Sequence, residues 1–168
     1  MRLLLYLLCA FTLLFAAQAT TPLIGPEYTG NVDAQTQAQA AKDVFTRLLG
    51  RERSEQFSIT IVKKNGNDYF HIAPQDDVIA ITASNGVSAC RALKWYLNNI
   101  CNVGITWRGD NLVNLPEDLP KDFAPTEETT PFKYRYIFNN CVFGYETAFW
   151  HWEDWEHMID ILAFNGIN

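Results

Sequence analysis

The C-terminal segment, residues 132–168, has the pattern of a single β-strand followed by a single amphipathic helix. Residues 133–138 (KYRYIF) alternate and are rich in aromatic side chains, which predicts a strand, and residues 149–164 predict a helix that Gly166 ends. Parallel strands are buried on both faces, so one strand and one helix cannot form a complete core. We therefore expect the first unit of a larger α/β structure. If that structure is a (β/α)8 barrel, it needs about 250 residues, and the chain is a fragment or a truncated gene model.

The predicted C-terminal helix separates its apolar and acidic side chains. We expect the apolar face to be core and the acids to be solvated, because charges on an amphipathic helix usually face water. The apolar face comprises Trp152, Trp155, Ile159 and Leu162, and the acids are Glu153, Asp154, Glu156 and Asp160. His151 and His157 are six positions apart and do not share a face, so they are poor candidates for metal binding or for a general base.

The preceding residues, 34–115, predict one small α/β domain with its own core. Helical patterns cover residues 34–49, which Gly50 ends, and 87–99, where Cys90, Leu93 and Leu97 recur on one face. Strand patterns cover residues 57–62, 69–73, 78–82, 104–107 and 111–115. Residues 20–33 are a lead-in, and residues 116–131, with four prolines and an acidic excess, are expected to be a linker with little regular structure.

Residues 1–19 have the three parts of a secretory signal peptide. Arg2 is followed by an almost purely apolar run that closes with Ala17-Gln18-Ala19, a cleavage-site pattern. The alternative is a membrane anchor, but a span needs about 20 apolar residues and this run is shorter. We expect cleavage after Ala19, a secretory route, and no membrane association afterwards.

Charge and cysteine content narrow the classes of partner. The chain has a net charge of −6, which becomes −7 when Arg2 is removed. Nucleic acids and anionic membranes bind basic patches, so neither is expected as a partner.

The mature chain would keep Cys90, Cys101 and Cys141, an odd number, and the first two are too far apart along a helix to form a disulfide. No metal-ligand spacing is present, so neither a metal nor another cofactor is expected.

Residues 134–168 carry the most specific motif. Their sequence, YRYIFNNCVFGYETAFWHWEDWEHMIDILAFNGIN, resembles the opening of the catalytic barrel in the lysosomal alpha-N-acetylglucosaminidase family. The shared pattern is Y-R-Y, then N-x-C-x-x-x-Y, then a Trp-rich helix that ends in A-x-N-G-I-N. Residues 57–115 look more loosely like the small α/β domain that precedes this barrel and those of hexosaminidases and alpha-glucuronidases. The resemblance implies a hexosaminidase-like α/β domain followed by the first strand and helix of a truncated (β/α)8 barrel.

The resemblance also implies a function. Members of the family are retaining exo-glycosidases that remove terminal alpha-linked N-acetylglucosamine, in animals from heparan sulfate, so a glycan is the expected partner. Retaining hydrolysis needs two carboxyl groups about 5 Å apart. In the family both are glutamates on later strands, beyond the end of this chain. No catalytic residue is therefore expected here, and the chain alone should be inactive.

Three residues match the family's sugar-binding loop. Asn139, Cys141 and Tyr145 occupy the N-x-C-x-x-x-Y positions, and loops at the C-terminal ends of barrel strands form active sites. An amide bonds sugar hydroxyls as donor and acceptor, and a tyrosine offers an apolar face with a polar tip. On residue type alone, Asn139 would end a strand while Cys141 and Tyr145 would pack in a core. With the resemblance, we expect them to line the pocket for the terminal sugar.

Two other readings remain open. The chain is alternatively a stand-alone secreted module without catalytic activity whose α/β domain binds glycan or protein. Its final helix would then expose the Trp152 and Trp155 face, and such patches promote aggregation. It is also compatible with a fragment of a hexosaminidase or an alpha-glucuronidase relative, which acts on a different sugar.

Overall fold

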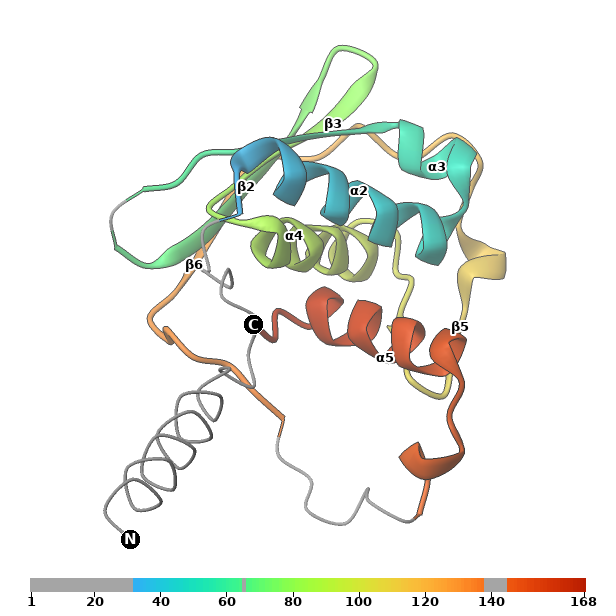
Figure 1. Ribbon diagram of the computed structural model, residues 1–168. Coiled ribbons are helices and arrows are strands. Elements are labelled where there is room, and N and C mark those ends of the chain that lie inside the picture. Colours follow the sequence, from blue (N-terminus) through green and yellow to red (C-terminus); the bar gives the residue numbers. More distant parts are fainter. Residues whose placement is uncertain (1–31, 65, 138–144) are drawn as a thin grey trace, which may run out of the picture. The chain divides into compact units, whose positions relative to one another are not determined.

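The first helix is set by a cap at each end. The computed structural model describes residues 32–64, 66–137 and 145–168, and Asp33–Asn168 form one compact unit (Figure 1). Helix α2 spans Ala34–Leu49, and the Asp33 carboxylate accepts hydrogen bonds from the Thr36 backbone N–H (2.9 Å) and hydroxyl (2.6 Å). Gly50 ends the helix with φ +83°, a backbone conformation that favours glycine. The predicted helix over residues 34–49 is confirmed, and a short helix, α3 (Arg51–Glu55), follows it.

A four-stranded mixed sheet is the centre of the fold. Its order is β1 (Phe57–Ile61), β3 (Val78–Ala83), β2 (Asp68–Gln75) and β6 (Thr126–Thr130). Strands β1 and β3 are parallel, and β2 runs antiparallel to both of its neighbours. The three predicted strands in this region are confirmed, with ends that differ by one or two residues. Their β-branched and aromatic residues were therefore a sufficient signal for these strands.

Strand β6 lies where the sequence predicted a linker. Thr126–Thr130 occupies the open edge of β2, with Glu128 opposite Phe70, so the prediction that residues 116–131 have little regular structure is wrong at its C-terminal end. The prolines and acids of this segment favoured a linker, although three threonines at its C-terminal end favour a strand. The conformation is decided by the edge of β2, whose paired residues lie 54 or more positions earlier in the chain, and local composition carries no information about such a partner.

The predicted strand at residues 111–115 is also wrong. A small hairpin is formed instead by β4 (Ile105–Thr106) and β5 (Gly109–Asp110), and Leu112–Asn114 is a 3-10 turn. The Asp110 carboxylate accepts from the Leu112 backbone N–H (2.9 Å), and the Asn111 side chain accepts from the Gly104 N–H (2.7 Å). Side chains of this kind compete with a strand ladder for the backbone groups.

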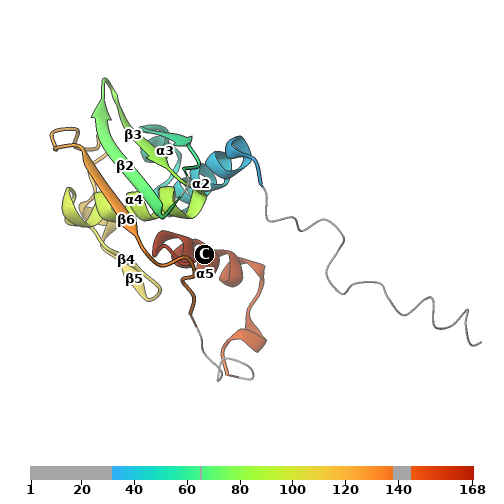
Figure 2. The same cartoon turned by 90° about the vertical axis from the view of Figure 1, so that its left-hand side faces the viewer.

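Helices α2 and α4 cover one face of the sheet (Figure 1, Figure 2). Helix α4 spans Gly86–Asn99, and Cys90, Leu93 and Leu97 are buried, as the sequence predicted. In the core, the rings of Phe45, Phe57 and Tyr96 meet edge to face, with centroids 5.2 and 5.5 Å apart. The two helices approach closely at Gly86, where an added Cβ would lie 2.9 Å from the Gln37 carbonyl oxygen. A side chain at position 86 would push the helices apart.

Cys90 and Cys101 are free thiols, and the expectation that they do not bridge one another is confirmed. Burial in the core raises the pKa of the Cys90 thiol to about 12, and partial burial also raises that of Cys101. Cys141 lies outside the described residues. Among the described helices, none combines the length and apolar composition needed to cross a bilayer.

Helix α5 spans Trp152–Phe164 and packs against α4 with a different face from the predicted one. Its buried residues are Asp160, Ile161 and Phe164. Trp152 and Ile159, predicted to be core, are 64 % and 51 % exposed, and Trp155 is also exposed, which is the exposure expected if no barrel covers them. The helix begins three residues later than predicted, after a 3-10 turn at Thr147–Phe149. Helix α5 thus has two faces able to pack, and the described residues cover one.

Asp160 was predicted to be solvated and is only 2 % exposed. Its carboxylate accepts two hydrogen bonds from the Arg47 guanidinium on α2, one from Nε (2.6 Å) and one from Nη2 (2.7 Å). A buried carboxylate without such a partner would lose its hydration uncompensated. The bidentate pair therefore explains how an acid can lie in the contact between α5 and the sheet domain.

We expect Asp160→Ala to lower the free energy of unfolding by about 2 kcal/mol, since a charge-assisted pair at a buried site is lost while Arg47 can turn to water. Urea unfolding followed by circular dichroism measures this change. The control is Asp118→Ala, which removes a carboxylate that is 90 % exposed and pairs with Lys121; its cost should stay below about 0.5 kcal/mol. Equal losses in the two variants would contradict a structural role for the buried pair.

Candidate functional site

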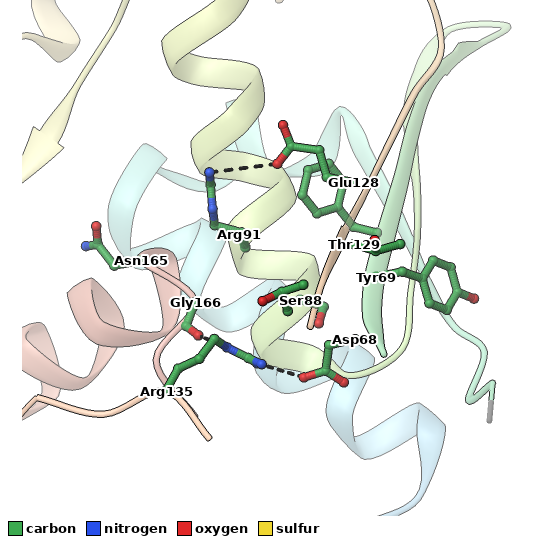
Figure 3. Close-up of a pocket in the computed structure, with 11 residues that line it drawn as sticks. Asp68, Tyr69, Ser88, Arg91, Glu128, Thr129, Arg135, Asn165 and Gly166 are labelled. Carbon is green, nitrogen blue, oxygen red and sulfur yellow. Dashed lines mark hydrogen bonds and ion pairs between the residues drawn. The ribbon is translucent and has the colours of Figure 1, made fainter. Parts of the chain in front are cut away.

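The start of the last strand–helix unit is held by Arg135. Its guanidinium donates to the Phe132 carbonyl oxygen (2.6 Å), to the Gly166 carbonyl oxygen (2.6 Å) and to Asp68 Oδ2 (2.7 Å), as Figure 3 shows in part. One side chain thereby joins the extended segment at residues 132–135, the end of α5 and strand β2. The contact fastens the unit to the sheet domain.

Asn168 completes this joint. Its backbone N–H donates to the Arg135 carbonyl oxygen (3.0 Å), its side-chain oxygen accepts from the Arg135 N–H (2.9 Å) and its amide donates to the Lys133 carbonyl oxygen (3.0 Å). The predicted strand at 133–138 has no assigned strand in its described part, and its extended backbone pairs here with Asn168 instead. This pairing brings the chain after α5 back beside the segment before it, as in a βα unit.

Asp68 is the partner of Arg135 in the sheet domain. Its other oxygen, Oδ1, accepts from the Asn85 side-chain amide (2.8 Å) and from the Ser84 hydroxyl (3.0 Å). Asn85 in turn caps α4 by accepting from the Ser88 N–H (2.8 Å). Partial burial acts to raise the pKa of Asp68, but the hydrogen bonds from Arg135, Ser84 and Asn85 outweigh it and lower the pKa below its usual value.

A cavity of about 250 Å³ lies at this joint (Figure 3). Arg91 crosses it toward Glu128, with 3.8 Å between guanidinium and carboxylate. Its walls come from the β2–β6 edge, α4 and the end of α5 (Asp68, Tyr69, Phe70, Ser88, Arg91, Glu128, Thr129, Thr130, Arg135, Asn165 and Gly166). Substrates of barrel enzymes bind at the opposite end, where strands run into helices. The cavity is therefore part of the joint and is not where we expect the sugar site.

Only one of the three predicted sugar-binding residues lies in the part of the chain that the structure describes. Asn139 and Cys141 lie outside the described residues. Tyr145 is described and is 78 % exposed, on the turn that leads into the 3-10 turn before α5. It is not a core residue of the described chain, so its phenol is available to a ligand. Its part in sugar binding stays a prediction.

The start of α5 is capped by its own residues. The His151 N–H donates to Asp154 Oδ2 (2.9 Å), and the His151 side chain accepts from the Asp154 N–H in a reciprocal capping box. Glu153 and Asp154 lie in the first turn, where negative charge complements the helix dipole. These roles account for the acids near the motif without any catalytic function.

Sequence reasoning missed the aromatic contact of Trp107. This residue lies at the turn of the β4–β5 hairpin, and its ring meets those of Trp150 (centroids 5.1 Å apart) and His157 (5.5 Å). Trp155 meets Trp150 edge to face at 4.9 Å. No local pattern marks Trp107, because its partners are more than 40 residues away. Sequence reasoning also missed the Arg135–Asp68 pair, although Arg135 is the central residue of the Y-R-Y motif.

A small α/β domain followed by the first strand–helix unit of a barrel is the arrangement of a two-domain glycoside hydrolase, and comparisons with known proteins agree. Residues 39–121 match the family described as the alpha-N-acetylglucosaminidase (NAGLU) N-terminal domain. Residues 135–168 match the tim-barrel domain of the same family. The chain belongs to the alpha-N-acetylglucosaminidase family and corresponds to the N-terminal portion of its members.

The relatives are considerably longer than this chain. It is 33 % identical to human alpha-N-acetylglucosaminidase over 141 residues, which are 81 % of this chain and 19 % of the human protein. A family 89 glycoside hydrolase from Clostridium perfringens, solved with 2-acetamido-1,2-dideoxynojirmycin, gives a TM-score of 0.75 at 33 % identity over 80 % of this chain and 16 % of that one. A second structure of the Clostridium perfringens enzyme holds its substrate GlcNAc-alpha-1,4-galactose and gives a TM-score of 0.74 at 34 % identity over 80 % of this chain and 15 % of that one. These matches confirm the predicted fold class.

The lowered pKa of Asp68 predicts an acid-sensitive joint. The charged Asp68 carboxylate stabilises the fold fully above the unfolded pKa of about 3.9, and this stabilisation is lost as the pH falls through the lower pKa of the folded state. Asp68→Asn, which cannot titrate, should therefore reduce the free energy of unfolding more at about pH 6 than at about pH 3. Urea unfolding at both pH values measures the difference. Asp76→Asn, in the exposed turn between β2 and β3, is the control and should show the same small effect at each. An Asp68→Asn effect independent of pH would contradict the role of its charge.

Proposed function

We propose that this chain is the N-terminal part of an exo-glycosidase that removes terminal alpha-linked N-acetylglucosamine from glycosaminoglycan chains of the heparan sulfate type. Family membership across both matched regions is the observation that carries the proposal. The substrate GlcNAc-alpha-1,4-galactose of the Clostridium perfringens relative supports the sugar and the linkage. The signal-peptide pattern and the human relative support a secretory route that ends in the lysosome or outside the cell.

Within this function, residues 1–168 would supply part of the sugar site and none of the catalytic carboxylates. Asn139, Cys141 and Tyr145 would contact the terminal sugar through an amide, a small side chain and a phenol. The nucleophile and the acid/base of retaining hydrolysis are expected on later strands, about 5 Å apart. The chain alone would then be inactive.

Exposed apolar side chains favour this proposal over a stand-alone binding module. Of the twelve large apolar residues exposed in the described chain, nine lie between residues 132 and 159. They are Phe132, Tyr134, Tyr136, Ile137, Tyr145, Phe149, Trp152, Trp155 and Ile159. Nine exposed large apolar side chains within one segment of this length are typical of an interface and unusual on an isolated soluble module. Further strands and helices of a barrel would cover them.

The test is expression of the complete coding sequence that carries this chain, beside residues 1–168 alone, in a secreting host. We expect the complete protein to release N-acetylglucosamine from GlcNAc-alpha-1,4-galactose and the 168-residue chain to release none. N-terminal sequencing of the secreted product should begin at Thr20. Robust turnover by the 168-residue chain would overturn the assignment of catalytic groups to later strands. Release of a different terminal sugar by the complete protein would favour a hexosaminidase or alpha-glucuronidase relative.

Tyr145→Phe in the complete protein tests the predicted contact. Loss of one hydroxyl that bonds the sugar should raise KM about fivefold with little change in kcat, since a neutral hydrogen bond contributes about 1 kcal/mol. Steady-state kinetics on the same disaccharide measure this split. Tyr134→Phe is the matched control, because Tyr134 is similarly exposed but lies next to Arg135, at the joint with the sheet domain. Equal KM values for the two variants and the wild type would contradict the role of Tyr145.

A further inference from the structure

The β4–β5 hairpin is a stiff projection of the sheet domain. Its first strand is anchored by Ile105, which is buried in the core. The Thr106 hydroxyl closes the turn by donating to the Gly109 carbonyl oxygen (2.7 Å) and accepting from the Arg108 N–H (3.3 Å). Gly109 takes φ +146°, a conformation that other residues rarely adopt. The turn therefore holds Trp107 in a defined position.

The ring of Trp107 contacts two residues at the start of the C-terminal helix. It is stacked on the His157 ring at an interplanar angle of 30° and meets the Trp150 ring in a tilted arrangement at 36°. In Figure 1 the hairpin lies beside the beginning of α5. Aromatic pairs of this geometry stabilise beyond the area they bury. Trp107 thus connects the first half of α5 to the sheet domain, and Arg135 connects the end of α5 to it.

Two backbone hydrogen bonds link Trp150 to the residues that follow Tyr145. The Phe149 N–H donates to the Glu146 carbonyl oxygen (3.0 Å), and the Trp150 N–H donates to that of Thr147 (3.4 Å), so the segment is one compact turn. Tyr145 begins this turn. A shift of Trp150 would therefore reach Glu146, the residue next to Tyr145, through these two hydrogen bonds.

We propose that Trp107, from the N-terminal domain, is a positioning residue of the sugar site. It acts through Trp150 and the 3-10 turn, and it sets where the Tyr145 phenol is presented. The inference rests on the proposed function, because it assumes that Tyr145 contacts the terminal N-acetylglucosamine. It assigns to the N-terminal domain a part in substrate affinity in addition to its part in stability.

Kinetics of the complete protein test this role. Trp107→Ala should raise KM for GlcNAc-alpha-1,4-galactose about tenfold and change kcat less than about twofold, since a positional error weakens ground state and transition state alike. Trp107→Phe keeps a stacking ring and should restore most of the affinity. Trp95→Ala is the matched control: Trp95 lies on α4, its ring meets that of Phe123, and its loss should leave KM unchanged.

Hydrogen exchange of the 168-residue chain gives a second readout. Trp107→Ala should accelerate exchange at the amides of Phe149, Trp150 and Trp155, which are bonded within the turn and the first turn of α5. The amides of Ile161 to Phe164, at the buried end of the helix, should keep their protection.

The outcomes separate this inference from the proposed function. Wild-type turnover with an unchanged KM in Trp107→Ala would overturn the positioning role and leave the function intact. Unchanged exchange at Phe149 and Trp150 would overturn it as well, because Trp107 would then not hold the turn. No release of N-acetylglucosamine by the wild-type complete protein would overturn the proposed function itself.

Discussion

The structure depends first on a buried carboxylate. Asp160 can enter the contact between α5 and the sheet domain only where a cation meets it, and Arg47 on α2 is that cation. This requirement favours the face of α5 that docks, although Trp152, Trp155 and Ile159 remain exposed on the helix. Hydrophobic burial of Ile161 and Phe164 supplies attraction without direction. The two-point contact between guanidinium and carboxylate supplies the direction.

The other contacts between α5 and the sheet domain follow from this choice. Once Asp160 is in place, the end of α5 comes within reach of Arg135 and Asp68, and its start meets the Trp107 ring. The joint at the end of the helix is polar and the contact at its start is aromatic. The polar pairs at the end of the helix fix the register of the extended segment with Asn168. The ring contacts at its start hold the segment next to Tyr145, where we propose that the sugar binds.

Local patterns predicted the elements better than their contacts. The helix at 34–49 and the strands near 57, 69 and 78 were predictable because their own residues carry the periodicity and the stop signals. Strand β6 and the docked face of α5 were not, because each is decided by a partner distant in sequence. Asp160 was misassigned for the same reason: its partner is 113 residues away. At the candidate site, the motif indicated Tyr145, while Trp107 and Arg135 emerged only from the three-dimensional contacts.

Strand β6 has a practical consequence for anyone who isolates the first domain. The family match to that domain ends at residue 121, before Thr126. A protein cut there would leave the outer edge of β2 without its partner, exposing a row of unpaired N–H and C=O groups beside Phe70 and Ile72. Bare edges of this kind recruit strands from other molecules. The folded sheet domain therefore extends at least to Thr130, because its edge strand β6 belongs to the segment that leads into the barrel.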